Sequence, residues 1–298
     1  MKTVIASALS LLLLMASIAS HSQEAEGAPK VTSTALKSGL HLLQGRGGNV
    51  VASIGEDGVL MIDDDYGEYA EAYHEALRSL QGSDALPRFI VNTHWHGDHT
   101  GSNAYWAERG AVIVAQDNVY QRMSTRQEIK AFGRVVEPSP RIALPVVTYT
   151  DSSMLRFNNE QIELMHLPNG HTDGDTVVFF VKANLVHTGD LFFKDRYPFV
   201  DIDSGGNAKQ FAANVAEILQ RVDEQTVIVP GHGSLAQKAD LERYLEMLKT
   251  SIALVTDKLD SGMTLEQITS EGLDPQWSSW GEGFIDEAKW IGFIARGR

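Results

Sequence analysis

Seven side chains that can bind a metal ion stand in short loops of this chain, and four of them lie within six residues. His94, His96, Asp98 and His99 belong to the segment His-Trp-His-Gly-Asp-His, which follows the apolar residues 89–91. Imidazole and carboxylate groups are zinc ligands, and a catalytic zinc keeps one position open for water. Four ligands from so short a loop exceed what one such ion would take from it. The spacing therefore favours two neighbouring metal ions.

Three further candidates occupy loops next to predicted strands. His171 lies in a glycine-rich turn between two such strands. Asp190 directly follows a strand predicted at 185–187, and His232 follows one predicted at 226–229. Loops at one edge of a sheet system bring together residues that are far apart in the sequence. We therefore expect these three side chains to complete the site that the histidine loop begins.

The composition limits the chemistry that is possible. The chain has no cysteine, which excludes disulfides, thiolate metal sites, iron–sulfur clusters and cysteine nucleophiles. Its 25 Lys and Arg against 39 Asp and Glu give a formal net charge of -14 at pH 7. Such an acidic chain disfavours nucleic acid or an anionic membrane as a partner, because phosphate binding needs a basic surface. A small-molecule substrate is expected instead.

The first 22 residues (1–22) predict a signal peptide. Lys2 gives a basic start, residues 4–19 are apolar or small, and small-x-small cleavage sites end at Ala19 and Ser22. This apolar stretch is short for a membrane span, which needs about 20 residues. An uncleaved N-terminal anchor is the alternative interpretation. We expect a periplasmic or secreted protein that keeps no stable membrane anchor after signal cleavage.

A polar linker, residues 23–30, precedes a single predicted domain, residues 31–298. Hydrophobic periodicity predicts a β-meander, a helix, a strand and a helix, and then the same order again. The predicted strands are 40–43, 49–54, 59–62, 89–91, 111–114, 154–157, 162–167, 176–181, 185–187 and 226–229. The predicted helices are 68–80, 103–109, 208–222, 240–259, 265–270 and 284–295. Helices on the outer faces of two stacked sheets would satisfy both periodicities, so the expected fold is an α/β (α+β) four-layer αββα sandwich.

These motifs, in this order, resemble the metallo-β-lactamase superfamily over essentially the whole mature chain. The resemblance implies the αββα fold with two zinc ions, Zn(2+), bound between its sheets. It implies that the ligands of the first zinc are His94, His96 and His171, and that those of the second are Asp98, His99 and His232.

The resemblance also assigns two further carboxylates. Asp190 is expected to bridge both ions, as in the hydroxyacylglutathione-hydrolase-like branch of the superfamily. Asp63 occupies the position whose carboxylate supports the histidine loop from behind the ligands, which would fix imidazole tautomers. Asp64 and Asp65 are adjacent, so the sequence leaves open which of the three points inward.

The implied activity is hydrolysis without a side-chain nucleophile. Two zinc ions about 3.5–4 Å apart lower the pKa of a bridging water toward neutrality, and the hydroxide attacks a carbonyl carbon. The bond cleaved would be an ester, lactone, thioester, amide or β-lactam. Asp98 is the candidate to orient the hydroxide and relay its proton. Candidate substrate contacts are Arg46 in the glycine-rich turn 45–48, Trp95 and Lys194.

Dedicated β-lactamase activity is a narrower alternative. The β-lactamases with three histidines on one zinc place a cysteine on the second, where this chain has Asp190. They also place a lysine soon after it that holds the substrate carboxylate, whereas Lys194 follows Asp190 by four residues. These departures disfavour efficient β-lactam hydrolysis, and predicted export keeps it open.

Three other classes compete with a hydrolase. An iron-dependent oxidoreductase of the same superfamily would use related ligands, but retention of His96, His99 and His232 favours two hydrolytic metals. A non-enzymatic metal-binding module should have a closed site, whereas Asp98 and a water position suggest an open one. A nucleic-acid-processing enzyme is disfavoured by the acidic charge and the export signal.

Overall fold

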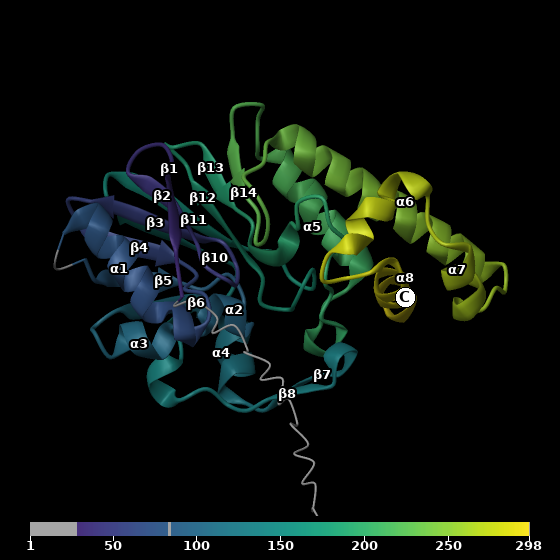
Figure 1. Cartoon of the computed structure of the whole chain (residues 1–298), viewed down its shortest axis with the longest axis horizontal. Helices are drawn as coiled ribbons and strands as arrows, with labels where there is room; N and C mark the ends of the chain where they lie inside the picture. The colour runs from purple at the N-terminus through teal and green to yellow at the C-terminus, as the bar shows by residue number, and fades with distance from the viewer. Residues whose placement is uncertain (1–28, 83–84, 298) are drawn as a thin grey trace, which may run out of the picture.

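The computed structural model describes residues 29–82 and 85–297. Two mixed β-sheets stack face to face, and helices cover their outer faces (Figure 1). This layering confirms the expected αββα sandwich. The predicted signal peptide and most of the predicted linker lie outside the described residues. Among the helices that are described, we find none with the length and apolar character needed to cross a membrane.

The first sheet has seven strands within the described residues. Its first four strands form an antiparallel meander, as the sequence predicts for three of them, and the last three strands join in parallel. In spatial order the strands are β1 (Thr32–Ala35), β2 (Leu40–Gln44), β3 (Val50–Gly55), β4 (Gly58–Ile62), β5 (Pro87–Val91), β6 (Val112–Gln116) and β9 (Val147–Tyr149). The histidine loop follows β5 directly.

The second sheet repeats this plan with five described strands. Four strands form an antiparallel meander and the fifth pairs in parallel with the fourth. They are β10 (Ser152–Phe157), β11 (Glu160–His166), β12 (Thr176–Phe180), β13 (Leu185–His187) and β14 (Val227–Val229). Asp190 follows β13 and His232 follows β14, so the loops at one end of each sheet carry the candidate ligands.

Helices and short turns connect the strands. The helices are α1 (Ala70–Gln81), α2 (Gly97–Thr100), α3 (Asn103–Ala107), α4 (Asp117–Ser124), α5 (Ala208–Gln220), α6 (Lys238–Asp260), α7 (Leu265–Glu271) and α8 (Glu287–Arg296). The 3₁₀ turns are η1 (Gly67–Tyr69), η2 (Lys130–Phe132), η3 (Arg141–Ala143), η4 (Gly189–Leu191), η5 (Ile202–Ser204) and η6 (Pro275–Glu282). A separate hairpin, β7 (Gln127–Ile129) and β8 (Arg134–Val136), lies between the sandwich and the C-terminal helices (Figure 1).

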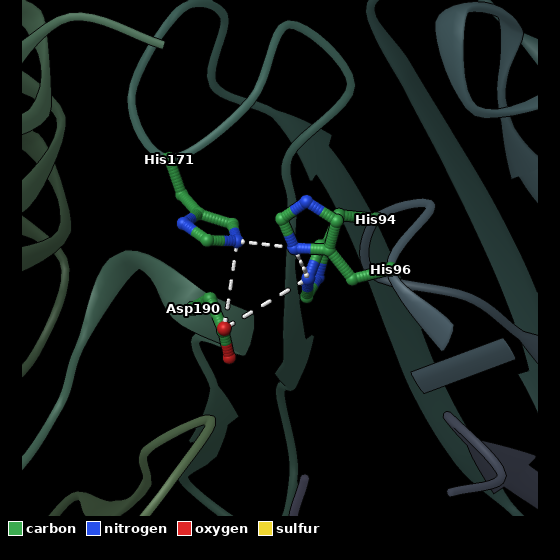
Figure 2. A group of neighbouring side chains, drawn as sticks. All are labelled: His94, His96, His171 and Asp190. Carbon is green, nitrogen blue, oxygen red and sulfur yellow. Dashed lines mark hydrogen bonds and ion pairs between the residues drawn. The ribbon is translucent and has the colours of Figure 1, made fainter. Parts of the chain in front are cut away.

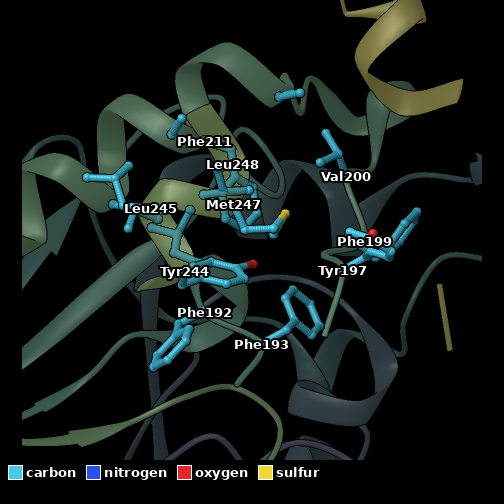
Figure 3. Packing of buried hydrophobic residues seen from close by; sticks show 14 of the residues in the cluster. Phe192, Phe193, Tyr197, Phe199, Val200, Phe211, Tyr244, Leu245, Met247 and Leu248 are labelled. Atoms are coloured by element: carbon cyan, nitrogen blue, oxygen red, sulfur yellow. The ribbon is translucent and has the colours of Figure 1, made fainter. Parts of the chain in front are cut away.

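Three apolar clusters hold the layers together. Side chains such as Ile62 and Val178 fill the space between the sheets. Trp106 of α3 packs with α1 on the outer face of the first sheet. On the outer face of the second sheet, Tyr244 of α6 lies between Phe192 and Phe211, with ring centroids 4.9 and 6.2 Å away (Figure 3). Burial of aromatic surface therefore fixes both helical layers.

Capping side chains move two helix starts away from the predicted positions. Gln237 and Asp240 form a capping box, so α6 begins at Lys238 rather than at 240. Asp286 accepts a hydrogen bond from the backbone N–H of Lys289 at 2.8 Å, so α8 begins at Glu287 rather than at 284. Phe284 therefore precedes the helix, where it is free to line a cavity.

Candidate metal centre

The histidine loop is held by hydrogen bonds close to the end of β5. The side-chain amide of Asn92 donates to the carbonyl of His99 at 3.2 Å, which closes the loop on itself. The turn 45–48 lies against it, and a Cβ on Gly48 would come within 2.2 Å of the His99 ring. Glycine is required there because only a residue without a side chain allows so close an approach. The local sequence thus positions His94, His96 and His99.

The first group of candidate ligands consists of His94, His96, His171 and Asp190, which converge from three loops (Figure 2). One ligand atom from each side chain lies within 4.8 Å of all the others. Nδ1 of His96 is 3.2 Å from Nε2 of His94 and 2.9 Å from Nε2 of His171. Four buried donor atoms at these distances surround a space the size of one metal ion.

The second group consists of Asp98, His99 and His232, whose ligand atoms also lie within 4.8 Å of one another. Oδ2 of Asp98 is 3.3 Å from Nε2 of His232 and 3.8 Å from Nε2 of His99. His99 is fully buried, whereas the side chains of Asp98 and His232 are each 22% exposed. This group therefore faces the solvent side of the site.

Asp190 lies between the two groups and turns a different oxygen to each. Its Oδ2 is 3.4 Å from Nε2 of His171 and 3.8 Å from Nε2 of His94. Its Oδ1 is 3.1 Å from Nε2 of His99 and 3.5 Å from Nε2 of His232. A carboxylate in this orientation can bind two ions at once.

Partners outside the groups fix the orientation of the imidazoles. Oδ2 of Asp63 is 2.7 Å from Nδ1 of His99, and the carbonyl of Phe199 is 2.8 Å from Nδ1 of His171. Each contact leaves Nε2 free to face the site. Such partners set both tautomer and ring orientation of a metal-binding histidine.

The carboxylate of Asp63 faces the site, while its neighbours serve the surrounding loops. Asp63 also accepts hydrogen bonds from the backbone N–H and the hydroxyl of Thr93, at 2.7 and 2.8 Å. Asp64 accepts from the backbone N–H of Ser102, and Asp65 accepts from the backbone N–H groups of residues 46 and 47. Asp65 thereby holds the glycine-rich turn.

Asp201 is a site residue that sequence reasoning missed. Its Oδ2 lies 3.0 Å from Nε2 of His96, which leaves Nδ1 of that ring facing the first group. Asp201 is 1% exposed, and burial disfavours its charged form, but His96, Ser204 and His171 together outweigh burial and lower the pKa of the carboxyl. It stands 105 residues beyond His96, in a loop with no ligand-type spacing.

The electrostatics of the side chains favour a bound cation. Burial lowers the pKa of His171 to about 4, so this imidazole is neutral and able to bind metal. Burial also opposes the charged form of His232, but the carboxylates of Asp190 and Asp98 outweigh it and raise the pKa to about 9. The carboxylates thus favour positive charge in the site. A bound metal ion would supply that charge and would displace the proton of an imidazolium.

The donor atoms fit two metal ions. Nε2 of His99 and Oδ1 of Asp190 are buried and have no hydrogen-bond partner within the described residues, although they lie close together. Buried polar atoms without partners are costly unless an ion or water satisfies them. A donor set of imidazoles and carboxylates suits zinc and related divalent ions. The two groups are therefore consistent with a binuclear metal site.

A cavity of about 670 Å³ opens over the two groups, and His96, Asp98, Asp190 and His232 lie in its wall. Of the three candidate substrate contacts, Arg46 and Trp95 also line it. Lys194 is not among the described residues that do. Its ammonium group donates to the carbonyl of Leu235 at 2.9 Å and pairs with Asp240 at 3.3 Å. The Lys194 side chain thus points toward the start of α6, and its contact with substrate stays a prediction.

The family model and the curated relatives that match this chain indicate the same protein family. A model of the metallo-β-lactamase superfamily matches residues 43–232. A hydroxyacylglutathione hydrolase of Pelagibacter ubique is 25% identical over 210 residues, which are 66% of this chain and 75% of the relative. The metallo-β-lactamase IND-1 of Chryseobacterium indologenes is 23% identical over 177 residues, covering 59% of this chain and 68% of the relative.

Solved structures share the fold at lower identity. A metallo-β-lactamase from Pontibacter korlensis superposes with a TM-score of 0.59 at 18% identity, covering 74% of this chain and 99% of that one. The sec-alkylsulfatase Pisa1 from Pseudomonas sp. gives a TM-score of 0.66 at 14% identity, covering 89% of this chain and 50% of that one. The matched family region contains all seven candidate ligands and ends at the last of them, His232.

Proposed function

Since this chain belongs to the metallo-β-lactamase superfamily and is a metal-dependent hydrolase, we propose that it is an exported, binuclear zinc enzyme that hydrolyses carbonyl compounds. The bond cleaved is that of an ester, lactone, thioester, amide or β-lactam. The observation that carries the proposal is the position of Asp190, whose two oxygens face two separate groups of ligands. A single-metal site would need only one of these groups.

Two bound zinc ions would supply Lewis-acid catalysis, lowering the pKa of a bound water and polarising the carbonyl group. The first group, with Asp190, would hold one ion, and Asp98, His99 and His232 would hold the other. Asp98 lines the cavity, and the positive charges of His99 and His232 hold the pKa of its carboxyl well below the usual range against the effect of burial. Asp98 is therefore ionised and can orient the attacking water by accepting a hydrogen bond from it.

Other residues of the chain organise the site. Asp63 and Asp201 fix the imidazoles of His99 and His96 by hydrogen bonds at 2.7 and 3.0 Å, so the ligands need little reordering when metal binds. The cavity wall includes Trp95 and Phe199, which exclude bulk water from one side of the reacting group. Low local polarity strengthens the electrostatic interactions of the catalytic groups.

The first experiment combines metal analysis with a substrate screen. The wild-type protein, loaded with zinc, is assayed against nitrocefin, lactones, thioesters and aryl esters in parallel. We expect two zinc ions per chain and turnover of at least one carbonyl substrate. His96→Ala and His232→Ala should each lower both metal content and turnover. His41→Ala is the matched control, because His41 lies on β2 outside both groups.

Specific results would contradict the proposal. Full activity of His96→Ala or His232→Ala would refute the assignment of the site. One iron per chain and no zinc would instead favour the oxidoreductase class, and turnover of nitrocefin alone would favour a dedicated β-lactamase. Export is tested separately, by sequencing the N-terminus of the protein recovered outside the cytoplasm, which should begin near residues 20–23.

A further inference from the structure

Two arginines in the cavity wall have no side-chain partner within the described residues. Outside the ligand groups, the charged residues of the wall are Arg46, Arg122, Arg134, Glu137 and Arg196. Three of them are paired: Arg46 with Glu68 at 3.3 Å, Arg122 with Asp173 at 2.7 Å, and Glu137 with Arg126 at 3.6 Å. The guanidinium groups of Arg134 and Arg196 make no ion pair or hydrogen bond in the described part of the chain. Both residues are exposed, so water solvates their guanidinium groups in the free protein and leaves them available to an anionic group of a ligand.

Arg134 reaches the metal end of the cavity. It begins strand β8 of the hairpin, and its terminal nitrogen is 4.0 Å from the position that a Cβ would take on Gly97. Gly97 stands between the candidate ligands His96 and Asp98. The positive charge of Arg134 also acts on the hydroxyl of Tyr66, where burial is the main cause of a raised pKa. The guanidinium therefore lies beside the histidine loop, within reach of a bound substrate.

A line of aromatic rings leads from the same point to the surface. The ring of Phe199 stacks on His96, with centroids 5.6 Å apart. Phe132 of η2 lies 5.0 Å from Phe199, and Phe284 lies 4.7 Å from Phe132. Phe284 is 65% exposed, so the line ends in solvent. Figure 3 shows the inner part of this wall, where Phe193, Tyr197 and Phe199 follow one another along the loop after Asp190.

Part of this wall lies outside the region that the family model matches. That region ends at His232, whereas Phe284 and Ile285 line the cavity from the segment before α8. The ring of Phe284 contributes less to packing than a buried ring would, because most of its surface contacts water. An apolar group of a ligand would cover this surface and gain binding energy from its burial.

On the basis of the proposed function, we infer that the substrate is an anionic amphiphile. Its apolar chain or ring lies along Phe199, Phe132 and Phe284, and its anionic group is bound by Arg134, with Arg196 at the rim. The anion is a carboxylate or another oxyanion that accepts two parallel hydrogen bonds from a guanidinium. This assignment places recognition of the substrate anion on the β7–β8 hairpin.

The test compares two esters of equal chain length. 4-Carboxyphenyl hexanoate carries a carboxylate next to the ester bond, and 4-carbamoylphenyl hexanoate is its neutral counterpart with the same acyl chain. We expect the wild-type zinc enzyme to have a higher kcat/KM for the carboxyphenyl ester. Arg134→Gln should lower the ratio of the two values about tenfold, as loss of a charged hydrogen bond predicts. Arg141→Gln should keep the wild-type ratio, because Arg141 is exposed on η3 and is not part of the cavity wall.

The apolar half of the inference has its own variant. Phe284→Ala should lower the preference for p-nitrophenyl hexanoate over p-nitrophenyl acetate about threefold or more, because apolar surface is lost where the chain lies. Leu265→Ala removes an exposed apolar side chain from α7, outside the cavity wall, and should leave this preference unchanged. Both substituted residues are exposed, so loss of the fold is not expected.

A binding measurement separates this inference from the proposed function. Octanoate, octyl sulfate and 1-octanol are titrated into the full chain while tryptophan fluorescence is recorded, since Trp95 lies in the cavity wall. Tighter binding of either anion than of the alcohol, weakened in Arg134→Gln, supports the inference even if no ester is hydrolysed. Ester turnover with no preference for the carboxyphenyl ester, and equal ratios in the wild type and Arg134→Gln, overturns the inference and leaves the proposed function standing.

Discussion

Asp201 contacts the nitrogen of His96 that points away from the metal site. It therefore determines which nitrogen of that ring can bind metal. Its carboxylate accepts from Nε2 of His96 at 3.0 Å, so the nitrogen that faces the first group is Nδ1. Asp201→Asn keeps the shape of the side chain but removes its charge. The neutral amide can present N–H₂ instead of oxygen, which would allow the imidazole to adopt the wrong tautomer.

The size of the effect follows from the contact. A hydrogen bond to a charged group contributes about 1.5–3 kcal/mol, and each 1.4 kcal/mol changes an equilibrium constant about tenfold. Asp201 is buried at 1% exposure, so water does not replace the lost contact. We therefore expect the first zinc to bind about 10- to 100-fold more weakly in Asp201→Asn, with a similar fall in kcat/KM at limiting zinc.

The assay is competition for zinc with a chromophoric chelator, followed by kinetics over a range of free zinc. Asp203→Asn is the matched control, because Asp203 stands in the same turn but bonds the backbone N–H of Lys130 at 2.8 Å instead of a ligand. Excess zinc should restore much of the activity of Asp201→Asn, which a folding defect would not allow. Zinc affinity within about twofold of the wild type in a folded Asp201→Asn would refute the reasoning.

Three further predictions test the remaining supports of the site and fold. Asp63→Asn should weaken the second zinc about 10- to 100-fold in the same competition assay, because His99 loses its charged acceptor at 2.7 Å; unchanged affinity would contradict the role of Asp63. Removal of zinc by a chelator should lower the melting temperature in calorimetry by about 5–10 °C per site, since a ligand present at 100 times its Kd stabilises the fold by about 2.7 kcal/mol. An unchanged melting temperature would argue against a metal site built from both sheets. Trp106→Ala should lower the free energy of unfolding, measured in urea, by about 3–5 kcal/mol, because this side chain is fully buried. Phe284→Ala should change it by less than about 1 kcal/mol, and equal effects of the two substitutions would contradict the assigned burial.

The sequence was sufficient for the layers and for the gathering of the seven candidate ligands. Strong apolar periodicity predicts the central strands. Asp190 and His232 follow two parallel strands, and His171 lies in the turn between two antiparallel ones, so all three stand in loops at the sheet edge. Weakly patterned elements were not predicted. All residues of β1 are exposed, and β9 has only three residues, so neither carries a clear alternation of buried and exposed positions.

Contacts between distant segments could not be predicted from spacing. Asp201 meets His96 only because the loop after η4 folds back over the histidine loop. Lys194 follows Asp190 closely, but its direction depends on the carbonyl of Leu235 and on Asp240 at the start of α6. Sequence proximity to a ligand therefore says little about the direction of a long, flexible side chain.

The division of the chain into metal-binding and substrate-binding parts follows from these geometries. The ligands come from loops at the strand ends of both sheets, where short connections and buried carboxylates allow little variation in position. Arg134 and Phe284 come instead from a surface hairpin and from the segment before α8, which pack on the sandwich without forming its sheets. Changes in those segments can alter the cavity wall while leaving the ligand distances intact. Substrate preference in this chain should accordingly respond to substitutions in the hairpin and the C-terminal segment, and metal affinity to substitutions in the strand-end loops.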